Sequence, residues 1–160
     1  MAVERPERDP GQWLVDDLGA DDRDAWSRLH RGYLDFYEST RPDEVSAIVW
    51  DWVTDSGHEL DCLVVRAAPG SEPVGIAHYR PFIRPLHGTV SCFLDDLFVA
   101  PEHRGTGAVD ALLAGVRDRA RDRGWTTVRW ITRATNSRAR STYDRLAVQT
   151  DLVTYDLAVD

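Results

Sequence analysis

The chain has 160 residues, of which 42% are hydrophobic, and a formal net charge of -8 at pH 7. This length suits one domain that buries about two-thirds of its unfolded surface. No apolar stretch is long enough for a membrane-spanning helix, and the charged, proline-bearing first eleven residues lack the apolar core of a secretory signal. We therefore expect a cytoplasmic protein without a membrane or nucleic-acid partner.

The acidic charge is concentrated in one part of the chain. Residues 16–61 carry thirteen acids and four arginines, whereas residues 62–160 are close to balance. Solvated helix faces account for such acidity in many proteins. The alternative is that this acidic front half attracts a cationic substrate.

The first half predicts a short strand followed by two amphipathic helices. The strand covers residues 12–18, and Asp21 or Asp22 can cap the next helix. A second helix starts at Pro42 and ends before Gly57. The first helix carries an aromatic and apolar stripe at three- and four-residue steps, which we assign mainly to the core: Trp26, Leu29, Tyr33, Phe36 and Tyr37.

From Cys62 onward the pattern is typical of strands alternating with helices. Prolines, beginning with Pro81, interrupt the chain before residue 89. Cys62 and Cys92 lie in apolar runs without metal-type spacing, so we expect both in the core. The expected elements are a hairpin of strands 62–67 and 74–82, a strand 89–99, a helix to about residue 123, a strand 128–132, a helix 136–146 and a final strand 152–159.

The most informative segment is a strand, a glycine loop and a helix within residues 94–113. The loop reads Arg104-Gly105-Thr106-Gly107. Two glycines this close allow a tight turn, and loop amides next to a helix N-terminus form an anion cradle. The chain has no lysine, and Asp110 stands where a dinucleotide fingerprint needs a third glycine. Both common nucleotide-binding loops are therefore excluded.

This loop resembles the R-x-x-G-x-[GA] acyl-CoA loop of the GNAT superfamily of N-acetyltransferases. Arg104 and Gly107 match the motif, while Val109 replaces the usual small residue. The longer phrase L-D-D-L-F-V-A-P-E-H-R-G-T-G is more specific, since acids before L-F-V and the P-x-x-R-G spacing recur in the family.

A second segment is similar to the family pattern W-x-T…N-x-x-A-x-x-x-Y-[DE]. It starts with Trp130-Ile131-Thr132 and continues from Asn136 to Tyr143-Asp144. The likeness is greatest to the branch that acetylates histones or polyamines, which usually has Gly-Phe where this chain has Asp151-Leu152.

The resemblance implies a fold and an activity. The fold is an α/β (α+β) GNAT domain, with a mixed central sheet of about six or seven strands and about four helices. It would span residues 12–160 after a flexible tail at 1–11. The implied reaction is transfer of an acetyl group from acetyl-CoA to a primary amine, a small cationic metabolite, by direct attack in a ternary complex. Two alternatives stay open: a non-catalytic acyl-CoA-binding module, and an enzyme that acetylates a protein N-terminus or lysine tail. A homodimer is compatible with either.

The resemblance also implies roles for individual residues, with acetyl-CoA as co-substrate and no metal. The Val99 amide would hold the acetyl oxygen, and Tyr143 would protonate the leaving thiolate. Asn136 would bind the pantetheine arm or merely cap its helix. The implied catalytic residues are Tyr143, Asp96 and Asp95, and the implied cofactor-binding residues are Leu97, Phe98, Val99, Arg104, Gly105, Thr106, Gly107, Ala108 and Asn136.

Strand alternation places Asp95 and Asp96 on opposite faces, so that one of them meets the acceptor. A carboxylate there could bind an ammonium and relay its proton through water; the alternative is a pair of acids in salt bridges with arginines. His78, His87 and His103 could act as bases by their chemistry, but no motif supports them.

Overall fold

The computed structural model describes residues 13–159, so the expected tail and Gln12 lie outside the described residues. The chain divides into two compact units, Met1–Trp130 and Ile131–Asp160, which are described separately. The elements of the first unit are β1 (Leu14–Asp17), η2 (Ala20–Asp22), α1 (Arg23–Phe36), α2 (Pro42–Thr54), β2 (Asp61–Arg66), β3 (Gly75–Arg84), η3 (Pro85–His87), β4 (Thr89–Val99), η4 (Pro101–His103), α3 (Ala108–Asp122) and β5 (Val128–Arg129).

The described residues form one mixed sheet of five strands in the order β1-β2-β3-β4-β5. The first four strands are antiparallel neighbours, and β5 pairs parallel to β4. The expected α/β fold class is confirmed, but the sheet has fewer strands than the expected six or seven. The final strand at 152–159 is absent: within the second unit, no described strand offers the hydrogen-bonding partner that its alternating pattern requires.

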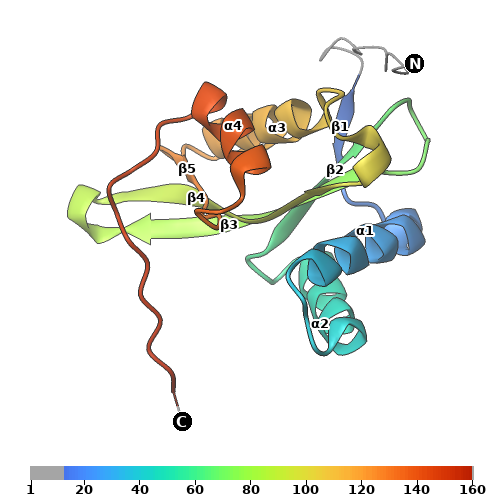
Figure 1. Ribbon diagram of the computed structural model, residues 1–160, viewed down its shortest axis with the longest axis horizontal. Coiled ribbons are helices and arrows are strands. Elements are labelled where there is room, and N and C mark those ends of the chain that lie inside the picture. The colour runs from blue at the N-terminus through green and yellow to red at the C-terminus, as the bar shows by residue number, and fades with distance from the viewer. Residues whose placement is uncertain (1–12, 160) are drawn as a thin grey trace. The chain divides into compact units, whose positions relative to one another are not determined.

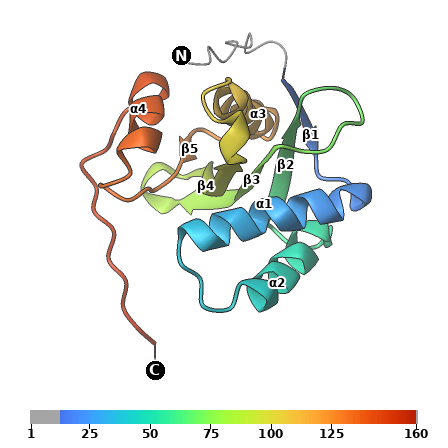
Figure 2. The same cartoon turned by 45° about the vertical axis from the view of Figure 1, so that its right-hand side comes forward.

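Helices cover both faces of this sheet, with α1 and α2 on one face and α3 on the other (Figures 1 and 2). Trp26 and Leu29 of α1 pack with Val64 of β2 and with Ile76 of β3. Gly32 brings α1 close to β4, since a Cβ atom there would lie 2.6 Å from the Phe98 ring. This close approach holds one end of β4 against α1.

The long β3–β4 hairpin carries the acidic residues of the site and the strand residues paired with them. Pro81 lies inside β3 opposite Cys92, and β3 continues to Arg84, two residues beyond the expected strand 74–82. The proline is accommodated because the pairing of β2 with β3 ends at Tyr79, so β3 is an edge strand at Pro81, where the missing N–H is tolerated. Gly88, at φ 61°, closes the hairpin in the left-handed region.

The second unit contains α4 (Ser137–Leu146). Asn136 is its N-cap: the Asn136 side chain accepts a hydrogen bond from the Ala139 amide at 3.4 Å. The helix therefore begins as the sequence predicts. Across the described residues, no helix combines the length and apolarity needed to cross a membrane.

Candidate active site

A β-bulge in β4 sets the direction of both acidic side chains. His78 of β3 pairs with Asp96, and the next residue, Tyr79, pairs with Leu94, so Asp95 is the extra residue. Asp96 hydrogen-bonds to His78, and Asp95 forms an ion pair with Arg80. His78 and Arg80 are two residues apart in β3 and share one face. The two acids therefore lie on the same face, and the prediction of opposite faces is wrong because the bulge breaks the alternation.

Asp96 ends a chain of hydrogen bonds that begins in the core. The Trp26 Nε1–H donates to His78 Nε2 at 3.0 Å, and His78 Nδ1 lies 2.8 Å from Asp96 Oδ2. Trp26 and His78 are completely buried, while the Asp96 side chain is 21% exposed. The chain thus connects a buried indole to a carboxylate that reaches solvent.

Two influences on the His78 imidazole act in opposite directions. Burial lowers the pKa of His78, whereas the neighbouring Cys62 and Asp96 groups raise it. Cys62 Sγ also donates to the Leu63 carbonyl at 3.5 Å. An indole N–H can only donate, so its position at Nε2 leaves no room for a second imidazole proton. The hydrogen-bond pattern therefore makes His78 neutral, with its proton on Nδ1.

The surroundings of Asp96 favour its ionised form. Burial raises the pKa of this carboxyl, whereas hydrogen bonds from His78 and Tyr33 lower it, and the net direction is below its usual range. Burial and Asp96 raise the pKa of Tyr33, so the phenol keeps its proton. Burial is the main cause that lowers the pKa of His30, to about 4, and its Nδ1 lies 2.9 Å from Ser46 Oγ. Near neutral pH, Asp96 is therefore a carboxylate among uncharged donors.

Asp95 is in a different electrostatic position. Arg80 Nε lies 3.0 Å from Asp95 Oδ2, and the guanidinium sits 5.0 Å from the Phe93 ring centroid. Burial raises the pKa of Asp95, and the Arg80 charge opposes that shift. Within residues 13–159, Arg80 balances the Asp95 charge, whereas no arginine forms an ion pair with Asp96.

The glycine loop after β4 has the backbone that the sequence predicts. Gly105 and Gly107 have φ angles of 75° and 88°, in the left-handed region that disfavours other residues. Among the described residues, the amides of 105–108 make no main-chain hydrogen bond outside helices and strands. The Trp13 Nε1–H donates to the Thr106 carbonyl at 2.7 Å and fixes the loop. Such a loop at the start of a 15-residue helix suits an anion.

The edge of β4 that faces β5 is only partly paired. Cys92 pairs with Val128 and Phe93 with Arg129, and in the described part of the chain β4 has no further pairing on this side. Along Leu97, Phe98 and Val99, therefore, no described strand pairs with this edge of β4. Arg104 Nε donates to the Val99 carbonyl at 3.1 Å, which ties the loop to the strand end.

Tyr143 and Asn136 belong to the second unit. Tyr143 lies in α4 and is half-buried. Asn136 uses its oxygen for the helix cap, and its Nδ2 donates to Thr132 Oγ1 at 3.3 Å. Their expected roles toward the cofactor stay predictions.

His30, His78 and Asp96 could in principle hold a metal, because one ligand atom from each lies within 4.8 Å of the others. A metal on His78 Nδ1 would move the imidazole proton to Nε2, which faces the Trp26 N–H donor. Metal-bound histidines instead donate their second N–H to an acceptor. The arrangement therefore fits a hydrogen-bond network better than a metal centre.

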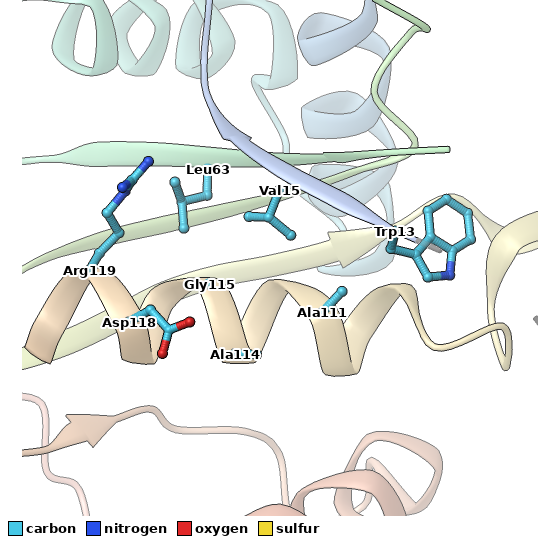
Figure 3. A pocket seen from close by; sticks show the side chains of 8 residues that line it. All are labelled: Trp13, Val15, Leu63, Ala111, Ala114, Gly115, Asp118 and Arg119. Carbon is cyan, nitrogen blue, oxygen red and sulfur yellow. The ribbon is translucent and has the colours of Figure 1, made fainter. Parts of the chain in front are cut away.

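A cavity of about 330 Å³ lies elsewhere, between α3 and strands β1 and β2 (Figure 3). Its lining is mostly small and apolar, with Asp118 and Arg119 at one end. Leu63 in this lining pairs with Ala77, whereas the neighbouring positions Val64 and Ile76 pack against Trp26 on the α1 face. The cavity is thus on the opposite face from Asp96.

Sequence reasoning identified the two acids but missed their partners. Trp26 and Tyr33 were assigned to the core stripe, and His78 had no supporting motif. Trp26, His30 and Tyr33 follow one another at steps of four and three residues, which puts their rings in one row on α1. The ring centroids of Trp26 and His30 are 4.7 Å apart, and the rings are stacked. The sequence signal for these partners is that a histidine, His30, and a tyrosine, Tyr33, lie in the same row as Trp26.

Comparisons with known proteins agree with this geometry. A model of the acetyltransferase (GNAT) family matches residues 26–147. The D-amino-acid N-acetyltransferase HPA3 of Saccharomyces cerevisiae is 28% identical over 156 residues, with 97% of each chain covered. The crystal structure of ribosomal-protein-alanine N-acetyltransferase from Brucella melitensis has a TM-score of 0.74 at 20% identity, covering 92% of this chain and 99% of that one. That of AAC(6')-Iy with a CoA-linked bisubstrate analogue has a TM-score of 0.76 at 16% identity, covering 92% and 99%.

The described residues combine a mixed sheet, a bulged acidic strand and a glycine loop at a helix N-terminus. The chain belongs to the acetyltransferase (GNAT) family. The expectation of an acetyltransferase is therefore confirmed.

Proposed function

We propose that this enzyme transfers an acetyl group from acetyl-CoA to the primary amine of a small cationic molecule, by direct attack in a ternary complex. The observation that carries the proposal is the geometry of Asp96, whose Oδ2 lies 2.8 Å from His78 Nδ1 and which forms no ion pair with an arginine among the described residues. An alkylammonium has a pKa of about 10.4 and must lose a proton before it attacks. Asp96 binds this ammonium, and water accepts its proton.

The overall charge of the protein supports a cationic acceptor. The formal net charge is -8, and the acidic residues 16–61 include α1, which packs over Asp96. Such a field raises the local concentration of cations. The likeness of the segment from Trp130 to Tyr143 to the histone and polyamine branch supports the same class of acceptor.

The acyl-CoA side of the site is proposed on the loop geometry. The amides of Arg104, Gly105, Thr106, Gly107 and Ala108 hold the pyrophosphate. Leu97, Phe98 and the Val99 amide line the thioester, with Val99 donating to the acetyl oxygen. Asn136 contacts the pantetheine arm. Tyr143 protonates the departing thiolate, for which a phenol with a pKa near 10 is suited.

An α-amino acid is a second candidate acceptor, favoured by Arg80. The Arg80 side chain is 34% exposed and shares the face of β3 that carries His78. An amino acid could place its carboxylate on Arg80 and its ammonium on Asp96. The 28% identity to a D-amino-acid N-acetyltransferase supports this reading.

A thiol-release assay with acetyl-CoA distinguishes these acceptors. The panel is 1,4-diaminobutane, D-alanine, a short peptide with a free N-terminal alanine, and an N-blocked lysine peptide. We expect the highest kcat/KM for the diamine. Preference for D-alanine, reduced by Arg80→Gln but not by the control Arg129→Gln, would support the amino-acid reading. Preference for a peptide would contradict both.

A further inference from the structure

We propose that His78 and Trp26 are positioning residues, which keep the Asp96 carboxylate ionised and oriented for the acceptor ammonium. The inference rests on the proposed function, because it assigns the acceptor amine to Asp96. Its geometric basis is the chain from Trp26 Nε1 through His78 to Asp96 Oδ2, with distances of 3.0 and 2.8 Å.

Trp26 sets the proton position on His78. A neutral imidazole can carry its proton on either nitrogen, and an indole N–H at Nε2 selects the form with the proton on Nδ1. That proton points at Asp96 Oδ2. His78 therefore donates to the carboxylate and stabilises its charge without cancelling it.

The packing around Trp26 holds its indole N–H toward His78 Nε2. The indole stacks on His30 at 4.7 Å and contacts Trp50 at 5.2 Å, so it cannot rotate away from His78. Trp26 and His78 are both completely buried.

Among the described residues, Asp96 is within ion-pair distance of His78 but of no arginine. Arg80 balances Asp95, while His30 and Tyr33 are uncharged near neutral pH. If His78 became an imidazolium, it would balance Asp96 as well, and the site would lose its attraction for an ammonium. The titratable and charged groups that face His78 or Asp96 are His30 and Tyr33 on α1, Cys62 on β2, Arg80 on β3 and Asp95 on β4.

NMR of the free enzyme tests the proton position without any acceptor. In protein labelled with ¹⁵N-histidine, we expect His78 to stay neutral with Nε2 unprotonated from about pH 5 to about pH 8. In Trp26→Phe, which keeps an aromatic ring but removes the N–H, His78 should become able to accept a second proton. A doubly protonated His78 in the parent enzyme at neutral pH would overturn the proposal.

Two substitutions of His78 separate positioning from packing. Asn places an N–H close to the position of Nδ1, whereas Leu fills the site without a donor. We expect His78→Leu to raise the pH at which the Asp96 carboxyl titrates, observed by ¹³C NMR. We also expect kcat for 1,4-diaminobutane to fall about a hundredfold, as for a misplacement of about 1 Å. His78→Asn should retain the parent titration and most of the turnover.

The control is Ser91→Ala. It removes a different buried polar group, the Ser91 hydroxyl of β4, which contacts Thr126. It should lower thermal stability without moving the Asp96 titration. An Asp96 titration that is the same in the parent, His78→Leu and Ser91→Ala would overturn the proposal. If His78→Leu does not fold, the NMR titrations of Trp26→Phe and His78→Asn decide whether the proposal holds. If no amine is acetylated, the proposed function fails, whereas the two NMR titrations still decide the positioning role.

Discussion

Replacing Asp96 by Asn tests the electrostatic role of the site, because it keeps the shape of the side chain and removes its charge. The Asn oxygen can still accept from His78 Nδ1, so the buried chain should persist. A unit positive charge about 4 Å from a unit negative charge is stabilised by about 4 kcal/mol at an effective dielectric constant of about 20. Losing that interaction corresponds to about a thousandfold in kcat/KM. We expect a decrease of this order for 1,4-diaminobutane.

Asp95→Asn is the matched comparison, since the neighbouring acid is already paired with Arg80 at 3.0 Å. Its kcat/KM should decrease by about tenfold at most, the usual scale of a partly exposed ion pair. Turnover is measured by thiol release and corrected for folded protein by circular dichroism. An Asp96→Asn enzyme with kcat/KM within about threefold of the parent would refute the electrostatic reasoning.

The same substitution has a signature in stability. The folded-state pKa of Asp96 is below its unfolded value, so its ionisation stabilises the fold at pH values above the unfolded pKa of about 3.9. That contribution disappears as the pH falls through the folded-state pKa. The difference in unfolding free energy between the parent and Asp96→Asn should therefore shrink under acid conditions, as measured by urea denaturation at several pH values.

Four further predictions follow from the rest of the chain. Tyr143→Phe should lower kcat by about 10²–10⁴ without changing acetyl-CoA affinity by calorimetry, and near-normal turnover would assign the proton transfer elsewhere. Gly107→Val should abolish acetyl-CoA binding, whereas Gly70→Val, also at positive φ (72°) but in the turn after β2, should not; equal loss in both would indicate unfolding. The kcat/KM for a diamine should fall as salt screens the protein charge, over about 10 Å at 0.1 M, and no salt effect would contradict electrostatic attraction. Arg66→Met should destabilise the fold by about 3–5 kcal/mol in urea denaturation, because it leaves the poorly exposed Asp22 unpaired, and a loss under about 1 kcal/mol would contradict this.

The glycine loop and β4 were predictable because their signals are local. A proline and two glycines follow the end of the strand. The positive φ angles of Gly105 and Gly107 favour glycine at both positions. The boundaries of β4 match the predicted residues 89–99. Local backbone chemistry was sufficient for this part of the site.

The bulge and the buried chain were not predictable because they depend on long-range pairing. Nothing in the order of Leu94, Asp95 and Asp96 shows that two of them oppose one residue of β3. Trp26 and His78 are 52 residues apart, and His78 and Asp96 are 18 apart. Their apolar surroundings make each look like a core residue until the sheet and α1 are assembled.

The most direct test of the central claim is mass spectrometry of enzyme, acetyl-CoA and 1,4-diaminobutane, before and after incubation. Direct attack on the amine predicts a diamine that gains one acetyl group for each CoA thiol released. It also predicts that the enzyme mass stays unchanged when acetyl-CoA is added alone. An acetylated enzyme that passes its acetyl group to the diamine would contradict direct attack. Acetyl-CoA binding without acetylation of any amine in the panel would contradict the proposed function itself.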